Sequence, residues 1–306
     1  MSTAFLFPGQ GSQSVGMMAG LAARPEIKST FEEASLALGQ DLWKLAREGP
    51  AEEINLTINT QPVMLAAGVA TYRAFLASGG KAPALMAGHS LGEYTALVAA
   101  NALSLEDAIK LVRFRAEAMR SAVPEGVGAM AAILGLDDDT VSAVCLEAAG
   151  NEVLEAVNLN SPGQVVIAGN KGAVERGMAL AREKGAKRAL ALPVSVPSHS
   201  SLMKPAAEEL STYLAQVPID SPQIPVLQNA DVADYADPEK IKSALVRQLF
   251  SPVRWVQTIV ALKNRGADRF VECGPGRVLA GLNKRIDNSL STLAITDEAS
   301  LEEAKS

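Results

Sequence analysis

A serine between two glycines is the strongest chemical signal in this sequence. Residues 88 to 92 read Gly-His-Ser-Leu-Gly, which matches the G-x-S-x-G pattern of a nucleophile elbow. In such an elbow a sharp turn from a strand into a helix holds the serine hydroxyl above the edge of a sheet. The apolar run at 84–87 and the helical pattern that begins at Glu93 predict this setting for Ser90. The alternative is a glycine-rich turn with a buried, inactive serine.

A serine hydroxyl needs a general base near neutral pH, and imidazole is the usual one. The sequence offers two histidines, His89 and His199. Because neighbouring side chains at the end of a strand point to opposite faces, His89 is badly placed to accept the proton of Ser90. By elimination we expect the base to be His199, which ends an extended, proline-containing segment at 193–199. The alternative is that His199 caps the helix that follows it.

An arginine lies on the apolar face of a predicted helix. The pattern Ser-Leu-Glu-Asp at 104–107 starts this helix as a capping box, and Arg115 falls in the middle of its apolar stripe, which consists of Ala108, Leu111, Val112, Met119 and Ala122. The other charged residues of the helix cluster on the opposite face. Since a buried guanidinium is costly unless paired, Arg115 either forms an internal salt bridge or binds a substrate carboxylate. Periodicity alone favours the internal salt bridge.

The loop at 7–13, Phe-Pro-Gly-Gln-Gly-Ser-Gln, follows the first predicted strand. In an α/β fold it lies at the carboxyl end of that strand, the same edge as the elbow. Its glycine backbone and the amide of Gln10 could therefore donate hydrogen bonds to an oxyanion. A phosphate-binding role is the weaker alternative, because the loop lacks the Gly-Lys-Ser/Thr ending of a P-loop and the GxGxxG spacing.

Composition excludes several classes of protein. The chain has 306 residues, 48% apolar and 20% charged, with a net charge of −6, so we expect a globular protein without overall attraction for nucleic acid or membrane surfaces. The two cysteines suit a reducing compartment, and the lack of a targeting segment or a long apolar run favours the cytoplasm. No HExxH or paired CxxC is present, so we expect no bound metal.

The elements that must position these residues alternate between short strands and longer helices, which predicts a parallel α/β sheet. After residue 197 we expect helices at 202–215, 240–250 and 253–265 and strands at 224–229 and 268–273. The rhythm changes at 127–197, where we expect strands at 129–134, 152–158, 164–168 and 188–192 and helices at 137–149 and 171–184. This is the βαββαβ order of a ferredoxin-like unit. We therefore expect a small subdomain, 127–197, inserted in a larger α/β domain formed by 1–126 and 198–306.

Seven motifs, taken in order, closely resemble the malonyl-CoA:acyl carrier protein transacylase family of bacterial type II fatty acid synthesis. They are FPGQGSQ at 7–13, GHSLGEY at 88–94, RFRAEAM around Arg115, NSPGQVVIAG at 160–169, PVSVPSHS at 193–200, QLFSPVRW at 248–255 and ECGPGRVL at 272–279. The resemblance covers about residues 3–295. It implies a hydrolase-like parallel-sheet core with an inserted ferredoxin-like subdomain.

The resemblance also implies roles for single residues. Ser90 would be the nucleophile and His199 its base, oriented by the backbone carbonyl of Gln248 in place of a triad carboxylate. Gln10 and the backbone N–H of Leu91 would form the oxyanion hole. Arg115 would bind the malonyl carboxylate, and Gln61 would lie near the acyl group. A small departure is Ala116, where many relatives have glycine.

The implied activity is transfer of malonyl from malonyl-CoA to the phosphopantetheine thiol of an acyl carrier protein through a malonyl-serine intermediate, with no bound cofactor. We expect a monomer that meets an acidic carrier transiently, with exposed basic residues at 187–188, 277 and 284–285 as candidate contacts. Three alternatives stay open. They are a serine esterase or thioesterase, a carrier-binding scaffold with a degenerate site, and an acyltransferase domain of a polyketide synthase.

Overall fold

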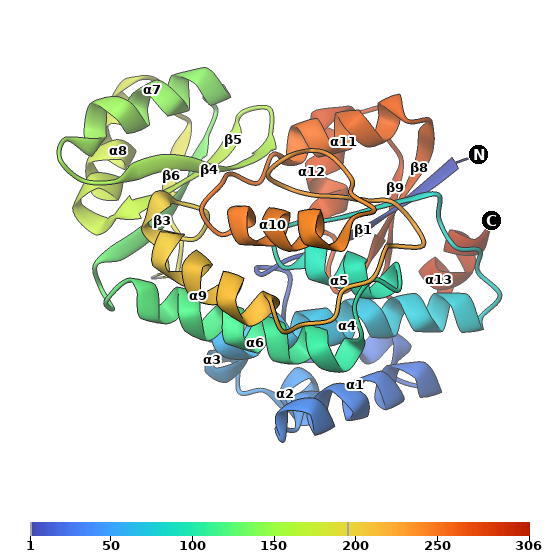
Figure 1. Ribbon diagram of the computed structural model, residues 1–306. Coiled ribbons are helices and arrows are strands. Elements are labelled where there is room, and N and C mark those ends of the chain that lie inside the picture. Colours follow the sequence, from blue (N-terminus) through green and yellow to red (C-terminus); the bar gives the residue numbers. More distant parts are fainter. Residues whose placement is uncertain (1, 195) are drawn as a thin grey trace.

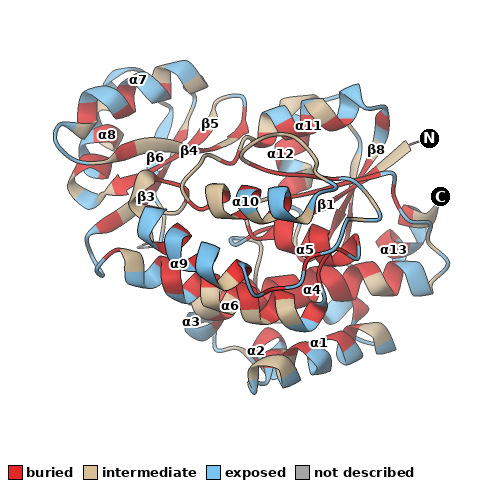
Figure 2. Ribbon diagram, in the orientation of Figure 1, coloured by how far each residue is buried: buried red, intermediate tan, exposed pale blue. Residues whose placement is uncertain are grey.

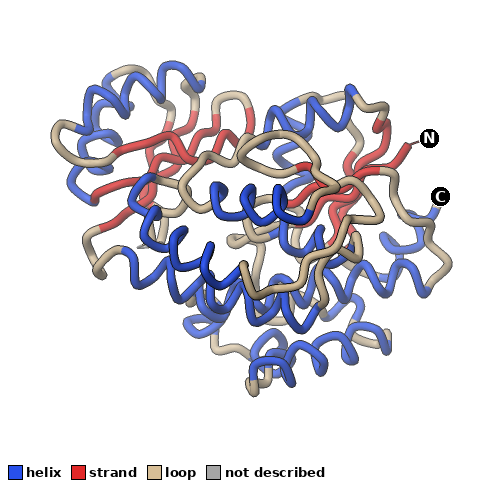
Figure 3. The backbone as a smooth tube through the Cα atoms, viewed as in Figure 1, coloured by secondary structure: helices blue, strands red, loops and turns tan. Residues whose placement is uncertain are grey.

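The computed structural model describes residues 2–194 and 196–306, so Met1 and Ser195 lie outside the described residues. Its strands form two separate sheets, one of five strands and one of four (Figures 1 and 3). The larger sheet is parallel throughout and the smaller one antiparallel. The predicted α/β class, a parallel-sheet core with a small ferredoxin-like unit, is confirmed.

The five-stranded sheet has the order β7-β2-β1-β8-β9. Its strands are β1 (Ser2–Phe7), β2 (Leu85–Gly88), β7 (Val226–Leu227), β8 (Ala267–Cys273) and β9 (Thr292–Ile295). Side chains of β1 alternate between two cores, since Phe5 and Phe7 belong to one apolar cluster and Ala4 and Leu6 to another. Both faces of the sheet are therefore buried, as parallel sheets require.

Helices cover both faces of this sheet. One face carries α4 (Thr57–Ala77), α5 (Gly92–Ala99) and α6 (Leu105–Ala122), with η1 (Ala19–Leu21), α1 (Pro25–Leu38), α2 (Leu42–Glu48) and α3 (Ala51–Ile54) further out. The other face carries α11 (Trp255–Asn264) and α12 (Val278–Ile286). Figure 2 shows that α4 and α5 are buried along most of their length. These two helices form the rigid support beneath the elbow.

The four-stranded sheet has the order β4-β5-β3-β6. Its elements are β3 (Gly128–Leu134), α7 (Asp138–Ala149), β4 (Leu154–Ser161), β5 (Gln164–Asn170), α8 (Lys171–Glu183) and β6 (Arg188–Ala191). Helices α7 and α8 cover one face. The opposite face carries a small apolar cluster that includes Met130, Leu192 and Val194. All these strands lie within 127–197, and we propose those residues as the small subdomain and 1–126 with 198–306 as the large one.

The edge strand β4 of the small sheet also pairs with Val253, in the loop before α11. Val253 N–H donates to the Val157 carbonyl at 2.9 Å, and Leu159 N–H donates to the Val253 carbonyl at 3.0 Å. This parallel bridge explains why α11 begins at Trp255, although the sequence pattern predicts a helical start at Val253. A tertiary backbone pairing here takes precedence over local helix preference.

Three further segments differ from the predicted elements. The strand expected at 224–229 contains only Val226 and Leu227, because the Gln228 N–H turns away and donates to the Ala233 carbonyl at 2.8 Å. The helix expected at 202–215 divides into η2 (Ser201–Met203) and α9 (Lys204–Leu214), with Pro205 in the first turn of α9. The helix expected at 240–250 is α10 (Pro238–Gln248), capped by Asp237.

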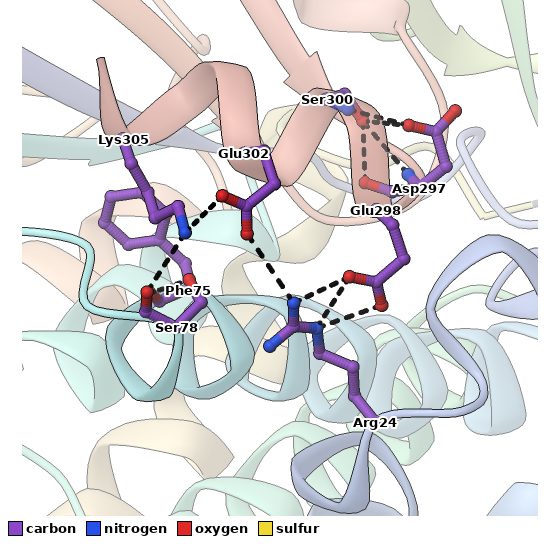
Figure 4. Close-up of polar contacts among 8 residues, drawn as sticks. All are labelled: Arg24, Phe75, Ser78, Asp297, Glu298, Ser300, Glu302 and Lys305. Atoms are coloured by element: carbon purple, nitrogen blue, oxygen red, sulfur yellow. Dashed lines mark hydrogen bonds and ion pairs between the residues drawn. The ribbon is translucent and has the colours of Figure 1, made fainter.

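The sequence patterns miss β9 and the last helix, α13 (Glu298–Lys305). Polar contacts attach α13 to the large domain, as Figure 4 shows. Arg24 pairs with Glu298 at 2.6 Å, and the Lys305 ammonium donates to the Ser78 carbonyl at 3.1 Å. Because these ion pairs are partly exposed, they contribute little stability, and burial of Leu301 is the firmer anchor.

Among the helices of residues 2–194 and 196–306, we find none with the length and apolar character needed to cross a membrane.

Candidate active site

The nucleophile elbow is built as the sequence predicts, between the end of β2 at Gly88 and the start of α5 at Gly92. Ser90 has a φ of 50°, in the left-handed region that side chains disfavour. A Cβ on Gly88 would lie 1.8 Å from the Gly92 carbonyl carbon, and a Cβ on Gly92 would lie 2.0 Å from the Phe7 carbonyl oxygen. Both glycines are therefore required by close backbone packing.

His199 lies against the serine. Its Nε2 is 2.8 Å from the Ser90 hydroxyl, and its Nδ1 is 2.7 Å from the Gln248 carbonyl oxygen. Since a carbonyl can only accept, Nδ1 carries the proton and the Nε2 lone pair faces the Ser90 O–H. The capping alternative is wrong, because the residues at the starts of η2 and α9 are Ser200 and Met203 and neither helix has a side-chain cap.

The environment of His199 keeps its imidazole neutral. Burial, followed by the nearby charge of Arg115, lowers the pKa of His199 from 6.5 to about 3. Only 4% of this residue is exposed, and its backbone φ of 66° is also in the left-handed region. A neutral imidazole bonded to a hydroxyl is the state that a general base needs before proton transfer.

Arg115 points into the same site from α6. Its guanidinium donates to the side-chain oxygen of Gln61 at 2.8 Å, to that of Gln248 at 3.0 Å, and to the Ser90 hydroxyl at 3.4 Å. It also lies 5.4 Å from the ring centroid of Tyr94. Within the described part of the chain, no carboxylate forms an ion pair with it. The favoured expectation of an internal salt bridge is therefore wrong.

These groups line one cavity of about 510 Å³. One wall of the cavity contains the polar residues Ser90, His199, Arg115 and Gln61. Its opposite wall comes from the small sheet and the segment that follows it, through Met130, Leu192, Pro193 and Val194. A wider groove of about 600 Å³, near Lys263 and Arg285 between α11 and α12, contains none of the predicted active-site residues.

The remaining predicted residues lie around this cavity. Gln10 is at its exposed rim, where its amide donates to the Thr57 hydroxyl at 3.0 Å. Leu91 is the N-cap residue of α5, and its N–H has no hydrogen-bond partner within the described residues. Gln61 is buried, with its amide nitrogen 3.7 Å from the Met119 sulfur. The structure brings all seven predicted site residues to one place.

His89 is directed away from the Ser90 hydroxyl, as strand geometry predicts. Its Nε2 lies 2.8 Å from the Asn160 side-chain oxygen, and its ring packs 5.4 Å from the ring of Trp255. Burial lowers its pKa, so it too is a neutral histidine.

Sequence reasoning misses two buried residues behind the serine, Asn229 and Glu93. The Asn229 side chain bonds to the Gly88 carbonyl and the Ser90 N–H, the backbone groups before and after His89, and Glu93 accepts the Asn229 N–H at 2.7 Å. Glu93 lies within the GHSLGEY motif, where it could have been noticed. Asn229 follows a two-residue strand with no motif around it, so only the folded chain reveals it.

Across residues 2–194 and 196–306, no group of three or more His, Cys, Asp or Glu side chains is arranged to hold a metal ion. The polar side chains that line the cavity include a hydroxyl, an imidazole, a guanidinium and amides.

The half-buried Ser90 hydroxyl bonded to the buried His199, at the edge of a parallel sheet and beside a small ferredoxin-like sheet, is consistent with an acyl-transferring class of α/β protein. Residues 4–295 match the profile of the acyl transferase domain, so the chain belongs to the acyl transferase domain family. The family resemblance seen in the sequence motifs is confirmed.

Particular relatives are also similar over their whole length. The malonyl CoA-acyl carrier protein transacylase of Escherichia coli strain K12 is 54% identical over 97% of both chains. A crystal structure of the acyl-carrier-protein S-malonyltransferase of Burkholderia pseudomallei 1710b superposes with a TM-score of 0.98, at 59% identity over 99% of both chains. A malonyl-transacylase in complex with its type II PKS acyl-carrier protein has a TM-score of 0.98 and 53% identity, over 100% of this chain and 99% of that one.

Proposed function

We propose that this protein transfers malonyl groups from malonyl-CoA to the phosphopantetheine thiol of an acyl carrier protein, for fatty acid synthesis. Family membership and the names of its full-length relatives support an S-malonyltransferase. The observation that carries the proposal is Arg115, a buried cation without a carboxylate partner in the described chain, 3.4 Å from the Ser90 hydroxyl. A malonyl thioester has a carboxylate at one end and a carbonyl at the other, which fits this pair.

In the first half-reaction, the Ser90 oxygen attacks the thioester carbonyl carbon while His199 Nε2 takes the hydroxyl proton. The carbonyl oxygen becomes an oxyanion, for which the Leu91 N–H and the Gln10 amide are the proposed donors. To serve as a donor, Gln10 exchanges its bond to Thr57 for one to the substrate. The C–S bond then breaks, and the CoA sulfur leaves with the proton from His199. The product is an O-malonyl ester of Ser90.

In the second half-reaction the phosphopantetheine thiol enters the vacated channel. His199 takes its proton, and the sulfur attacks the ester carbonyl. Ser90 oxygen leaves and recovers the proton from the imidazole, so the malonyl group ends on the carrier and the enzyme returns to its starting state. The Gln248 carbonyl, 2.7 Å from His199 Nδ1, holds the ring in one tautomer through both halves and stabilises its transient positive charge.

We propose that electrostatic attraction guides the acyl carrier protein to its docking site on this protein. We expect an acidic carrier to meet exposed basic side chains, with Lys187, Arg188, Arg277, Lys284 and Arg285 as candidates, of which Lys284 and Arg285 line the separate groove between α11 and α12. A related malonyl-transacylase has been crystallised with its acyl-carrier protein. We propose a transient encounter with a monomer in the cytoplasm, where two free buried cysteines stay reduced. The expected rate falls with added salt, and a rate insensitive to salt would contradict electrostatic docking.

Intact mass spectrometry tests the function directly. After mixing with malonyl-CoA, the wild-type protein should gain one malonyl group and Ser90→Ala none. Addition of holo acyl carrier protein should then remove the group from the enzyme and place it on the carrier. Acylation of Ser90→Ala would contradict the nucleophile assignment. Loss of the group to water at the same rate without carrier would instead indicate a thioesterase.

A further inference from the structure

The side chain of Asn229 bridges two backbone groups at the start of the turn that carries Ser90. Its oxygen accepts the Ser90 N–H at 2.6 Å, and its nitrogen donates to the Gly88 carbonyl at 2.6 Å. Asn229 follows β7, which pairs with β2 in the sheet, and only 1% of it is exposed. The asparagine thus reaches the elbow from the neighbouring strand and bonds to it with both ends of one amide.

The conformation of Ser90 requires such support. A φ of 50° at a residue with a side chain costs roughly 1–2 kcal/mol, so the surroundings must hold it. The Ser90 carbonyl is also held, since it accepts the side-chain N–H of Gln248 at 3.0 Å and the Glu93 N–H at 3.0 Å. Among these contacts, the Asn229 amide is the one that bonds to the turn at two points, the Gly88 carbonyl and the Ser90 N–H, and so bridges His89 on the N-terminal side of the Ser90 Cα.

Glu93 in turn fixes Asn229. One Glu93 oxygen accepts the Asn229 N–H at 2.7 Å, and the other has no partner in the described chain. Burial raises the pKa of Glu93 to about 8, so at neutral pH this carboxyl is mostly protonated. A neutral acid here holds Asn229 without placing a negative charge beside the substrate carboxylate.

The contacts also decide which backbone amide can bind an oxyanion. The Ser90 N–H is already taken by Asn229, whereas the Leu91 N–H has no partner within the described residues. We propose that Asn229 is a positioning residue for Ser90, which holds the left-handed turn and commits the Ser90 amide so that the Leu91 amide faces the oxyanion. This inference rests on the proposed acyl transfer, in which that oxyanion forms.

The test compares Asn229→Ala with a matched control. Asn283→Ala also removes a fully buried asparagine with two side-chain bonds, to Trp255 at 3.2 Å and Thr292 at 3.1 Å, but it has no contact with the elbow. Single-turnover acylation by malonyl-CoA should slow about 100-fold in Asn229→Ala, because a small displacement of a reacting group has an effect of this size. The final extent of acylation and the KM for malonyl-CoA should stay unchanged, and Asn283→Ala should react at the wild-type rate per folded molecule.

Asn229→Asp gives a second readout that loss of folding cannot imitate. When protonated, the new carboxyl group can accept the Ser90 N–H and donate to the Gly88 carbonyl, so it reproduces both bonds. When ionised, it loses the donor and adds a charge beside Glu93. We therefore expect acylation close to the wild-type rate at low pH and a fall as pH rises toward 8, while the wild-type rate stays flat over this range.

Reaction of Ser90 with phenylmethanesulfonyl fluoride tests the positioning role of Asn229 separately from the proposed malonyl transfer. If the wild-type protein reacts with the sulfonyl fluoride but is not acylated by malonyl-CoA, the proposed function is wrong, and the sulfonylation rates of the Asn229 variants still test the positioning role. If Asn229→Ala keeps the wild-type rate per folded molecule with either reagent, or slows no more than Asn283→Ala, the inference about Asn229 is wrong.

Discussion

The guanidinium of Arg115 lies 3.4 Å from the hydroxyl of Ser90, although only 2% of the arginine is exposed to solvent. A substrate that is attacked at Ser90 must therefore extend its acyl chain toward a buried positive charge. A carboxylate on that chain can form two parallel hydrogen bonds to the guanidinium. We therefore propose that the selectivity of the site depends on the charge of Arg115 beside the Ser90 hydroxyl.

Removal of this charge should abolish the preference for malonyl over acetyl donors. In the wild-type protein an acetyl group leaves Arg115 unpaired, at a cost of about 2 kcal/mol, which corresponds to roughly 30-fold in rate. We expect Arg115→Ala to lose most of this ratio of kcat/KM for malonyl-CoA and acetyl-CoA. Arg113→Ala, on the same helix and bonded to Gln40, is the control. An unchanged preference in Arg115→Ala would rule out the proposed binding role.

A carboxylate built into the protein should compete with the substrate. Gln61 accepts a hydrogen bond from Arg115 at 2.8 Å, so Gln61→Glu places a negative charge in ion-pair contact with the guanidinium. We expect the KM for malonyl-CoA to rise about 10-fold or more, with a smaller effect on acetyl-CoA. Gln61→Leu removes the amide without adding a charge. An equal rise of KM in both variants would show that charge is not the cause.

The acylation rate should not show the pH dependence of an ordinary histidine. Burial and the charge of Arg115 lower the pKa of His199 to about 3, so the base of the free enzyme stays neutral from pH 5 to 8. We expect kcat/KM for malonyl-CoA to be flat across this range. In Arg115→Ala the neighbouring charge is gone, so the pKa of His199 rises and the acid limb moves to higher pH. A wild-type midpoint near 6.5 would contradict this.

Glu93 should make stability depend on pH in the opposite sense from most carboxylates. Burial raises its pKa from 4.5 to about 8, so the stabilising contribution is complete below 4.5 and is lost as pH rises through 8. Glu93→Gln keeps a neutral oxygen that can accept the Asn229 N–H, and its stability should not fall with pH in this way. The unfolding free energy of the variant relative to wild type should therefore rise between pH 4.5 and 8, by on the order of 5 kcal/mol. Urea unfolding at several pH values measures the difference, and a constant difference would contradict it.

The second glycine of the elbow should tolerate no side chain. In Gly92→Ala the new Cβ meets the Phe7 carbonyl oxygen, and we expect a loss of about 3 kcal/mol or more in unfolding free energy. Gly281→Ala is the matched control, since Gly281 lies inside α12 with open space around it. The unfolding free energy of Gly281→Ala should be higher than that of the wild type by about 0.5–1 kcal/mol. Equal effects of the two substitutions in urea unfolding would contradict the packing argument.

Sequence patterns predict those parts of the fold in which local preference and burial agree. The strand at Ser2–Phe7, the capped helix at Leu105–Ala122 and the alternating elements of the small sheet are examples. The patterns fail where a distant partner decides the outcome. Val253 leaves its helix to pair with Val157 and Leu159, and β9 is a short edge strand held by β8.

In the site, too, some residues can be predicted from the sequence and others depend on distant partners. Ser90 and His199 follow from residue type and elimination, because few side chains can perform their chemistry. For Arg115, periodicity predicts burial but not the partner, since the neutral environment formed by Gln61 and Gln248 comes from helices far apart in the chain. Asn229 has no sequence signal, because its role consists entirely of bonds to a strand that it meets only after folding.

The cavity wall and the reacting groups belong to different parts of the chain. Met130, Leu192 and Val194 belong to β3 and the segment after β6, whereas Ser90, Arg115 and His199 lie outside that stretch. We expect exchange of the segment 127–194 with that of a relative to alter which cargo and which carrier arm fit, provided that Asn160, which lies 2.8 Å from His89 beside Ser90, is retained. Because the segment is contiguous in sequence, its replacement offers a route to engineer which acceptors this enzyme uses.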